Sequence, residues 1–176
     1  GQSISDHIFQ PNQKGCANLS DEIEQLQGND IFVIDIANMT ESIQSFIFGV
    51  VLQTVMKIKS ENKKDSPDRI VIFMDELNKY ASKEIPKRSP ILQQILDVTE
   101  RGRSLGVVLF GAEQFKSAIH DRVIGNCANN VYGRSNSVEL STRGYSYISK
   151  SIKSLITRLS PGELILQSPK FRQMMK

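Results

Sequence analysis

Apolar and polar residues follow two different periods along this chain. Short apolar runs bounded by turn residues predict buried strands, and apolar residues spaced three and four apart predict helices between them. The predicted strands cover residues 30–36, 69–74, 106–111, 128–133 and 163–167. The predicted helices cover residues 43–58, about 90–103, 116–123 and 145–159. Strands that alternate with helices form βαβ units, so the expected fold class is α/β, with a mainly parallel β-sheet and helices on both faces.

The beginning of the chain is patterned more weakly than the rest. Residues 1–29 predict only one short helix, after Ser20, and a stop at Gly28 and Asn29. We therefore expect a lead-in segment over residues 1–29 and one domain over residues 30–176. A chain of 176 residues that is 39% hydrophobic can bury one full core.

Composition excludes several classes of protein. The two cysteines, Cys16 and Cys127, lie far apart without a C-x-x-C motif and predict neither a disulfide framework nor a zinc site. We expect them to be reduced and partly buried. No apolar run approaches the roughly 18 residues of a membrane span, and the N-terminus lacks a signal-peptide pattern. These features favour a cytoplasmic protein without membrane contact.

Charge is distributed unevenly. Residues 143–176 contain seven lysines or arginines and one acid, so this C-terminal segment carries +6 and the preceding residues carry −3, within a net charge of +3. A basic surface of this kind is suited to nucleic acid or to an acidic partner. The ordinary alternative is a solvated face rich in lysine.

Two adjacent acids follow the second predicted strand, in the run IVIFMDELNKYA that covers residues 70–81. Ligands of parallel sheets bind at the carboxyl ends of the strands, which is where Asp75 and Glu76 are expected. Asp75 is suited to hold Mg²⁺ through water, and Glu76 is suited to orient and deprotonate an attacking water molecule. The alternative is that the strand ends in two solvated acids without a function.

Three further polar residues could complete such a site. Gln114 comes three residues after the third predicted strand, where its amide could contact a γ-phosphate and the attacking water. Arg101 and Arg103 lie at the end of the preceding helix, from which a guanidinium group could reach a neighbouring subunit and stabilise a phosphoryl group. Each also has an ordinary interpretation, as a surface glutamine or as arginines near a helix C-terminus.

The usual phosphate-binding loop is missing from these residues. None of the eleven glycines is followed by lysine, so no G-x-x-x-x-G-K-[ST] loop is present. Such loops provide most of the affinity for the β- and γ-phosphates through backbone N–H groups and the lysine. We therefore expect this chain to have negligible ATPase activity alone.

Together these motifs resemble the C-terminal half of the motor domain of HerA-type ATPases, in the HerA/FtsK branch of the additional-strand P-loop NTPases. The resemblance covers residues 30–170, and its order and spacing are more specific than any single piece. The matching runs are FVIDIANM, IVIFMDELNKYA, SPILQQILDVTERGRSLGVVLFGAEQ, NNVYGR and LSPGELIL. The resemblance implies part of a RecA-like core with three α/β/α layers.

The resemblance also implies roles for individual residues. Asp75 matches the Walker B carboxylate that holds magnesium, Glu76 the catalytic glutamate and Gln114 the sensor glutamine. Arg101 or Arg103 matches the arginine supplied to a neighbour's ATP, and the sequence leaves open which one.

For the protein as a whole, the resemblance implies ATP and Mg²⁺ as cofactors and double-stranded DNA as the substrate of a translocase or helicase. It further implies a ring, usually a hexamer, and a partner nuclease or effector, as in DNA end processing. Two alternatives stay open. One is a non-catalytic α/β interaction module, in which Asp75, Glu76, Gln114 and Arg101 point to unrelated surfaces. The other is a nucleic-acid-binding module that binds through the basic segment, residues 143–176.

Overall fold

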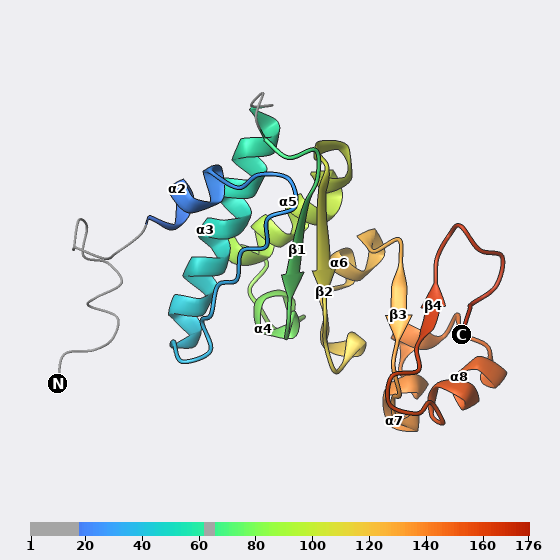
Figure 1. Ribbon diagram of the computed structural model, residues 1–176. Coiled ribbons are helices and arrows are strands. Elements are labelled where there is room, and N and C mark those ends of the chain that lie inside the picture. Colours follow the sequence, from blue (N-terminus) through green and yellow to red (C-terminus); the bar gives the residue numbers. More distant parts are fainter. Residues whose placement is uncertain (1–17, 62–65) are drawn as a thin grey trace. The chain divides into compact units, whose positions relative to one another are not determined.

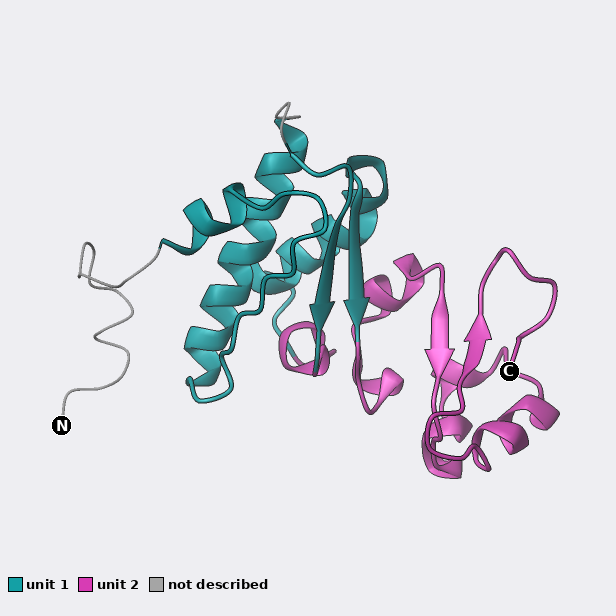
Figure 2. Cartoon of the chain, viewed as in Figure 1, with its two compact units in different colours: residues 1–75, 85–111 teal, residues 76–84, 112–176 magenta. Residues whose placement is uncertain are grey.

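The computed structural model describes residues 18–61 and 66–176, which form two compact units (Figure 2). The first unit contains residues up to 75 together with residues 85–111, and the second contains residues 76–84 and 112–176. The chain therefore passes from the first unit into the second at two points, after Asp75 and after Gly111.

The described residues of the first unit form, in chain order, the helices and strands α2 (Leu19–Glu24), α3 (Glu41–Ser60), β1 (Ile70–Met74), α5 (Pro90–Leu105) and β2 (Val107–Gly111) (Figure 1). Helices α3 and α5 pack against each other, α2 packs on α3, and α5 packs on β2. The predicted helices of this region and its two central strands are confirmed, with Pro90 at the start of α5 as proline's fixed φ favours.

Strands β1 and β2 are parallel neighbours, with Ile70 opposite Val107 and Met74 opposite Gly111. Alternate residues point to opposite faces, as the period of a strand requires. Ile72 and Met74 are buried on one face. The other face carries exposed apolar side chains, among them Phe73 and Phe110, whose rings stack at 4.9 Å. A helix layer over this second face is not seen among the described residues of the unit.

Gly106 allows α5 to turn directly into β2. Its φ of 75° lies in the left-handed region, which glycine adopts without steric cost, and its N–H donates to carbonyls of the last turn of α5. A Cβ at this position would lie 2.4 Å from the carbonyl oxygen of Asp68, which precedes β1. The glycine that ends the run ERGRSLG therefore permits close packing of two backbone segments.

The strand expected over residues 30–36 is not formed. These residues are assigned neither helix nor strand, and the side chains of Ile31 and Val33 are 89% and 81% exposed. An apolar run becomes a strand only when a neighbour accepts its backbone hydrogen bonds. Within the part of the chain that the structure describes, β1 pairs with β2 and with no strand from this segment.

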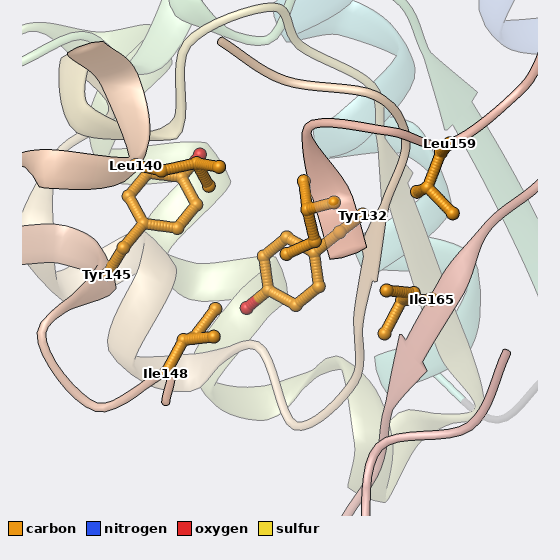
Figure 3. Packing of buried hydrophobic residues seen from close by; sticks show 7 residues of the cluster. Tyr132, Leu140, Tyr145, Ile148, Leu159 and Ile165 are labelled. Carbon is orange, nitrogen blue, oxygen red and sulfur yellow. The ribbon is translucent and has the colours of Figure 1, made fainter. Parts of the chain in front are cut away.

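The second unit contains short elements around a mixed aromatic and aliphatic core. In chain order these are α4 (Asn78–Ala81), η1 (Lys116–Ala118), α6 (Asp121–Asn126), β3 (Asn130–Tyr132), α7 (Ser137–Ser141), η2 (Arg143–Tyr145), α8 (Lys150–Ile156) and β4 (Ile165–Gln167). Strands β3 and β4 pair antiparallel. Figure 3 shows Tyr132 of β3 among the buried residues that pack around it, including Tyr145, Ile148 and Ile165.

Two expectations for this region need correction. The last two predicted strands form a separate antiparallel pair and do not extend the parallel sheet. The helix expected over residues 145–159 is limited to α8, because Ser149 caps a new helix start: its hydroxyl accepts the N–H of Ile152. The apolar spacing was correctly predicted, since Ile156 and Leu159 are buried, but the local cap divides the segment.

The compositional expectations have mixed outcomes. Cys127 is a free thiol, as expected, and although the residue as a whole is exposed, its Sγ is partly buried, donates to the carbonyl oxygen of Val123 at 3.3 Å, and has its pKa raised mainly by burial. Cys16 and most of the lead-in segment lie outside the described residues, and the division at residue 29 stays a prediction. No helix in the described ranges is long and apolar enough to cross a membrane.

Candidate functional site

The parallel pair places the ends of β1 and β2 at the same edge of the first unit's sheet. Met74 and Gly111, the last residues of the two strands, are partners in the ladder. Asp75 follows Met74 directly, and its side chain is exposed. This is the edge at which parallel sheets bind their ligands.

Glu76 has an unusual backbone. Its φ is 54°, in the left-handed region that residues with a side chain adopt at a cost of about 1–3 kcal/mol. The turn exposes the carboxylate of Glu76 while Leu77, the next residue, is buried. Lys79 forms an ion pair with Glu76 on the short helix that follows. Strained residues of this kind recur at functional sites. Asn29, with a φ of 75°, also has a left-handed backbone, but only Glu76 follows a strand of the parallel pair among the described residues.

Within the second unit, backbone hydrogen bonds connect the segments that follow the two strands, and one of them lies beside both Glu76 and Gln114. The N–H of Leu77 donates to the carbonyl oxygen of Ala112 at 3.0 Å. Glu76 is the residue before the donor, and Gln114 comes two residues after the acceptor, with an exposed side chain. The structure therefore brings the segments of these two predicted site residues together.

Glu113, beside Gln114, has a carboxyl group in an unusual environment. Its Oε2 atom is buried and has no hydrogen-bond partner among the described residues. Burial, together with the nearby carboxylate of Glu139, raises the pKa of Glu113 from 4.5 to about 7, although Lys116 acts in the opposite direction. A carboxyl group of this kind changes its charge near neutral pH.

Lys116 is buried immediately beyond this segment, with 8% of its surface exposed. Its Nζ donates to Asn130 Oδ1 at 3.0 Å and to the hydroxyl oxygens of Tyr132 and Tyr147 at 3.2 and 2.7 Å. The ammonium group also lies 5.2–5.8 Å from the ring centres of Tyr132, Tyr145 and Tyr147, within the range of cation–π attraction.

Glu139 of α7 completes this polar interior. It accepts hydrogen bonds from the N–H and the hydroxyl of Ser117, at 2.9 and 2.7 Å. Burial is the main cause that raises the pKa of Tyr145, and the carboxylate of Glu139 adds to it. Two adjacent residues of η1 are thus held by buried charges. Lys116 contributes its own ammonium group, and Ser117 is bound by the carboxylate of Glu139.

The arginines are not brought together with the acids. Helix α5 leads into the start of β2, so Arg101 and Arg103 are near the amino ends of the parallel strands, whereas Asp75 follows a carboxyl end. Arg101 donates from Nη2 to Asp97 Oδ2 at 2.8 Å, one helical turn away. Arg103 is exposed and makes no ion pair with any residue that the structure describes.

Asp75, which the sequence predicts to hold magnesium, has an exposed side chain at the end of β1. No group of three or more His, Cys, Asp or Glu residues within residues 18–61 and 66–176 could enclose a metal. Mg²⁺ bound with a nucleotide needs only one or two carboxylates, because phosphate oxygens and water complete its shell. An exposed carboxylate at the end of β1 fits that requirement, with the phosphate oxygens coming from the nucleotide.

The interior around Lys116 was not predicted from the sequence. The sequence pattern places Lys116 only at the start of the short helix predicted over residues 116–123. Lysine is among the residues that are least often buried, and its three hydrogen-bond partners lie 14 to 31 residues away. The sequence contains no local signal that would have identified this cluster.

Comparison with solved structures shows a recurring likeness to one viral protein, the genome packaging NTPase B204 from Sulfolobus turreted icosahedral virus 2. Its complex with AMP has a TM-score of 0.61 and 20% identity, covering 91% of this chain and 70% of that one. The AMPPCP complex has a TM-score of 0.63 and 18% identity over the same shares. The sulfate complex has a TM-score of 0.62 and 17% identity, over 92% and 71%.

This likeness establishes the class of fold. The chain has an α/β fold like that of this genome packaging NTPase, with parallel strands and packed helices. Neither protein-family models nor curated proteins gave a match.

Proposed function

We propose that this chain is the water-activating part of an ATP-driven motor that moves double-stranded DNA. The observation that carries the proposal is Glu76, an exposed carboxylate on a left-handed turn directly after a parallel strand. The turn costs conformational energy that a solvated surface acid does not require. The likeness to a genome packaging NTPase supports the nucleotide and DNA parts of the proposal.

In this proposal each residue has one chemical role. Glu76 orients the attacking water and accepts its proton, and the amide of Gln114 contacts the same water and the γ-phosphate. Asp75 holds the hydrated magnesium ion, which neutralises charge on the phosphates when it is bound. The hydrogen bond between Leu77 and Ala112 supports the proximity of Glu76 and Gln114.

Arg103 is the better candidate for an arginine supplied to a neighbouring subunit. Arg101 is already engaged by Asp97, and its guanidinium group would have to leave that partner. Arg103 is exposed near the opposite end of the strands from Asp75, as an arginine that acts on another subunit's nucleotide would be. A closed ring, such as a hexamer, would supply one such contact to every site.

The remaining parts of a motor would come from residues outside this sequence. A phosphate-binding loop with its lysine is needed for nucleotide affinity, and none is present here. The basic C-terminal segment, residues 143–176, is suited to bind DNA. A nuclease or effector would be the motor's partner. We expect no membrane contact and a cytoplasmic location.

The test is ATP hydrolysis by the full-length gene product that contains these residues. Glu76→Gln should lower kcat about 100-fold or more, because it removes the general base while preserving size. Glu84→Gln is the matched control, since Glu84 is an exposed glutamate of the same unit and its loss should leave kcat unchanged. Full activity of Glu76→Gln would refute the proposal, as would vigorous hydrolysis by this chain alone.

A further inference from the structure

The segment that carries Gln114 is held at both of its ends. At its start, the carbonyl oxygen of Ala112 accepts the N–H of Leu77 at 3.0 Å. At its end lies Lys116, which is buried and whose ammonium group donates three side-chain hydrogen bonds. Between these anchors, Gln114 and Phe115 are exposed to solvent.

The geometry around Lys116 matches a lysine specifically. A compact ammonium group has three N–H donors, and three oxygens receive them, from Asn130, Tyr132 and Tyr147. Asn130 and Tyr132 belong to β3, whereas Tyr147 lies beyond η2. The single side chain of Lys116 therefore ties the end of the Gln114 segment to two other parts of the second unit.

From these contacts we propose that Lys116 is a positioning residue for Gln114. The ammonium group fixes the segment 112–115 on β3 and on Tyr147, so that the exposed amide of Gln114 keeps a constant position relative to Glu76. This inference rests on the proposed function for the role of Gln114, but the anchoring itself does not.

Electrostatics agrees with this assignment. Burial and the carboxylate of Glu139 both raise the pKa of Glu113. The ammonium group of Lys116 acts in the opposite direction and lowers this pKa. Replacing Lys116 with a neutral residue should therefore raise the pKa of Glu113 above about 7. That change gives a spectroscopic signature that does not depend on catalysis.

The first experiment uses this chain and measures backbone order by ¹⁵N relaxation. In Lys116→Met, the order parameter of Gln114 should fall from about 0.85 to below about 0.6, while those of β2 stay unchanged. Tyr147→Phe should give a smaller fall at the same residue, because it removes one acceptor and preserves the ring. Lys150→Met, at an exposed lysine of the same unit, is the control and should change nothing.

Two results would overturn the inference. One is an unchanged order parameter for Gln114 in both Lys116→Met and Tyr147→Phe. The other is a loss of order throughout the second unit with no excess at Gln114, which would mean that Lys116 only stabilises the fold. If Lys116→Met fails to fold, Tyr147→Phe still decides the question, since Tyr147 is 52% exposed and its ring is retained.

The second experiment links the anchor to catalysis in the full-length gene product. Tyr147→Phe and Lys116→Met should lower kcat for ATP, by about tenfold or more in the lysine variant, with an unchanged KM, because binding is retained and alignment is lost. Unchanged kcat in both variants would overturn the catalytic part of the inference. If Glu76→Gln also retained full activity, the proposed function would fail, whereas the relaxation result would still establish or refute the anchor.

Discussion

The two units are stabilised by different kinds of buried residues. The core of the first unit is mainly aliphatic, with Leu52, Leu92 and Ile95 fully buried, and the buried polar side chains among its described residues are the uncharged Gln44 and Thr54. The second unit buries two charged residues, Lys116 and Glu139, beside the tyrosines of its core. The first unit thus depends on apolar area and close backbone packing, whereas the second depends on the completeness of a polar network.

This difference accounts for where the candidate chemistry lies. An apolar framework provides a rigid pair of parallel strands, and the chain leaves this framework directly after Asp75 and after Gly111. Of the proposed site residues, Asp75 is the last residue of the first unit before the chain leaves it, whereas Glu76 and Gln114 belong to the second unit.

The largest effect is expected from adding a methyl group where the first unit packs backbone on backbone. Gly106→Ala should lower the free energy of unfolding by about 3 kcal/mol or more, because a left-handed backbone penalty adds to a clash with the carbonyl oxygen of Asp68. Thermal or urea unfolding followed by circular dichroism measures the change.

Gly162 provides a matched control in the second unit. Its φ is 85°, similar to that of Gly106, but nothing lies within 4 Å of the position that a Cβ would occupy. Gly162→Ala should therefore cost only the backbone penalty, about 1–2 kcal/mol. Equal costs at the two glycines would contradict the view that close packing governs the first unit.

A second prediction concerns the pH dependence of the second unit. The pKa of Glu113 is raised from 4.5 to about 7, so the folded protein holds this proton more tightly than the unfolded chain does. Its contribution to stability is complete below about pH 4.5 and is lost as pH rises to about 7. Glu113→Gln should therefore be more stable than the wild type at pH 8, by roughly 1–2 kcal/mol once partial solvent screening is allowed for, with no advantage at pH 4.

Glu163 is the control with the opposite sign. Its pKa is lowered, mainly by a hydrogen bond from Lys176, so its contribution is present above the unfolded pKa and is lost as pH falls. Glu163→Gln should accordingly bring no gain at pH 8. If Glu113→Gln and Glu163→Gln changed the pH profile of stability in the same direction, the burial of Glu113 would not explain the pH dependence.

A smaller effect is expected at the strained turn. Glycine adopts a φ near 54° without the penalty of a Cβ, so Glu76→Gly should be more stable than Glu76→Ala, by about 1 kcal/mol. Both variants lack the carboxylate, and both should lose ATP hydrolysis in the full-length gene product. Equal stability of the two variants, measured by urea unfolding, would remove the strain argument for Glu76.

The first unit was more predictable from the sequence than the second. Helical spacing, the proline at residue 90 and short apolar runs are local signals, and they correctly predicted α3, α5, β1 and β2. The strand expected over residues 30–36 failed because strand formation depends on a neighbour that local pattern does not reveal.

The candidate site was predictable only in part, for a similar reason. Asp75, Glu76 and Gln114 could be selected because they follow apolar runs, and strand ends are adjacent in a parallel sheet. The left-handed backbone of Glu76 and the burial of Lys116 could not be predicted, because each depends on contacts between distant segments. Long-range polar contacts are thus the part of this molecule that sequence patterns describe least well.

The smallest expected effect on stability concerns the arginines of α5. The exposed ion pair of Arg101 with Asp97 spans one helical turn, and such pairs stabilise proteins by only about 0.3–0.5 kcal/mol. Arg101→Ala and Arg103→Ala should therefore both unfold within about 0.5 kcal/mol of the wild type. In the full-length gene product, however, Arg103→Ala should lower kcat for ATP much more than Arg101→Ala, since Asp97 already engages Arg101. A larger loss in Arg101→Ala would reverse this assignment and would mean that Asp97 releases Arg101 when subunits meet.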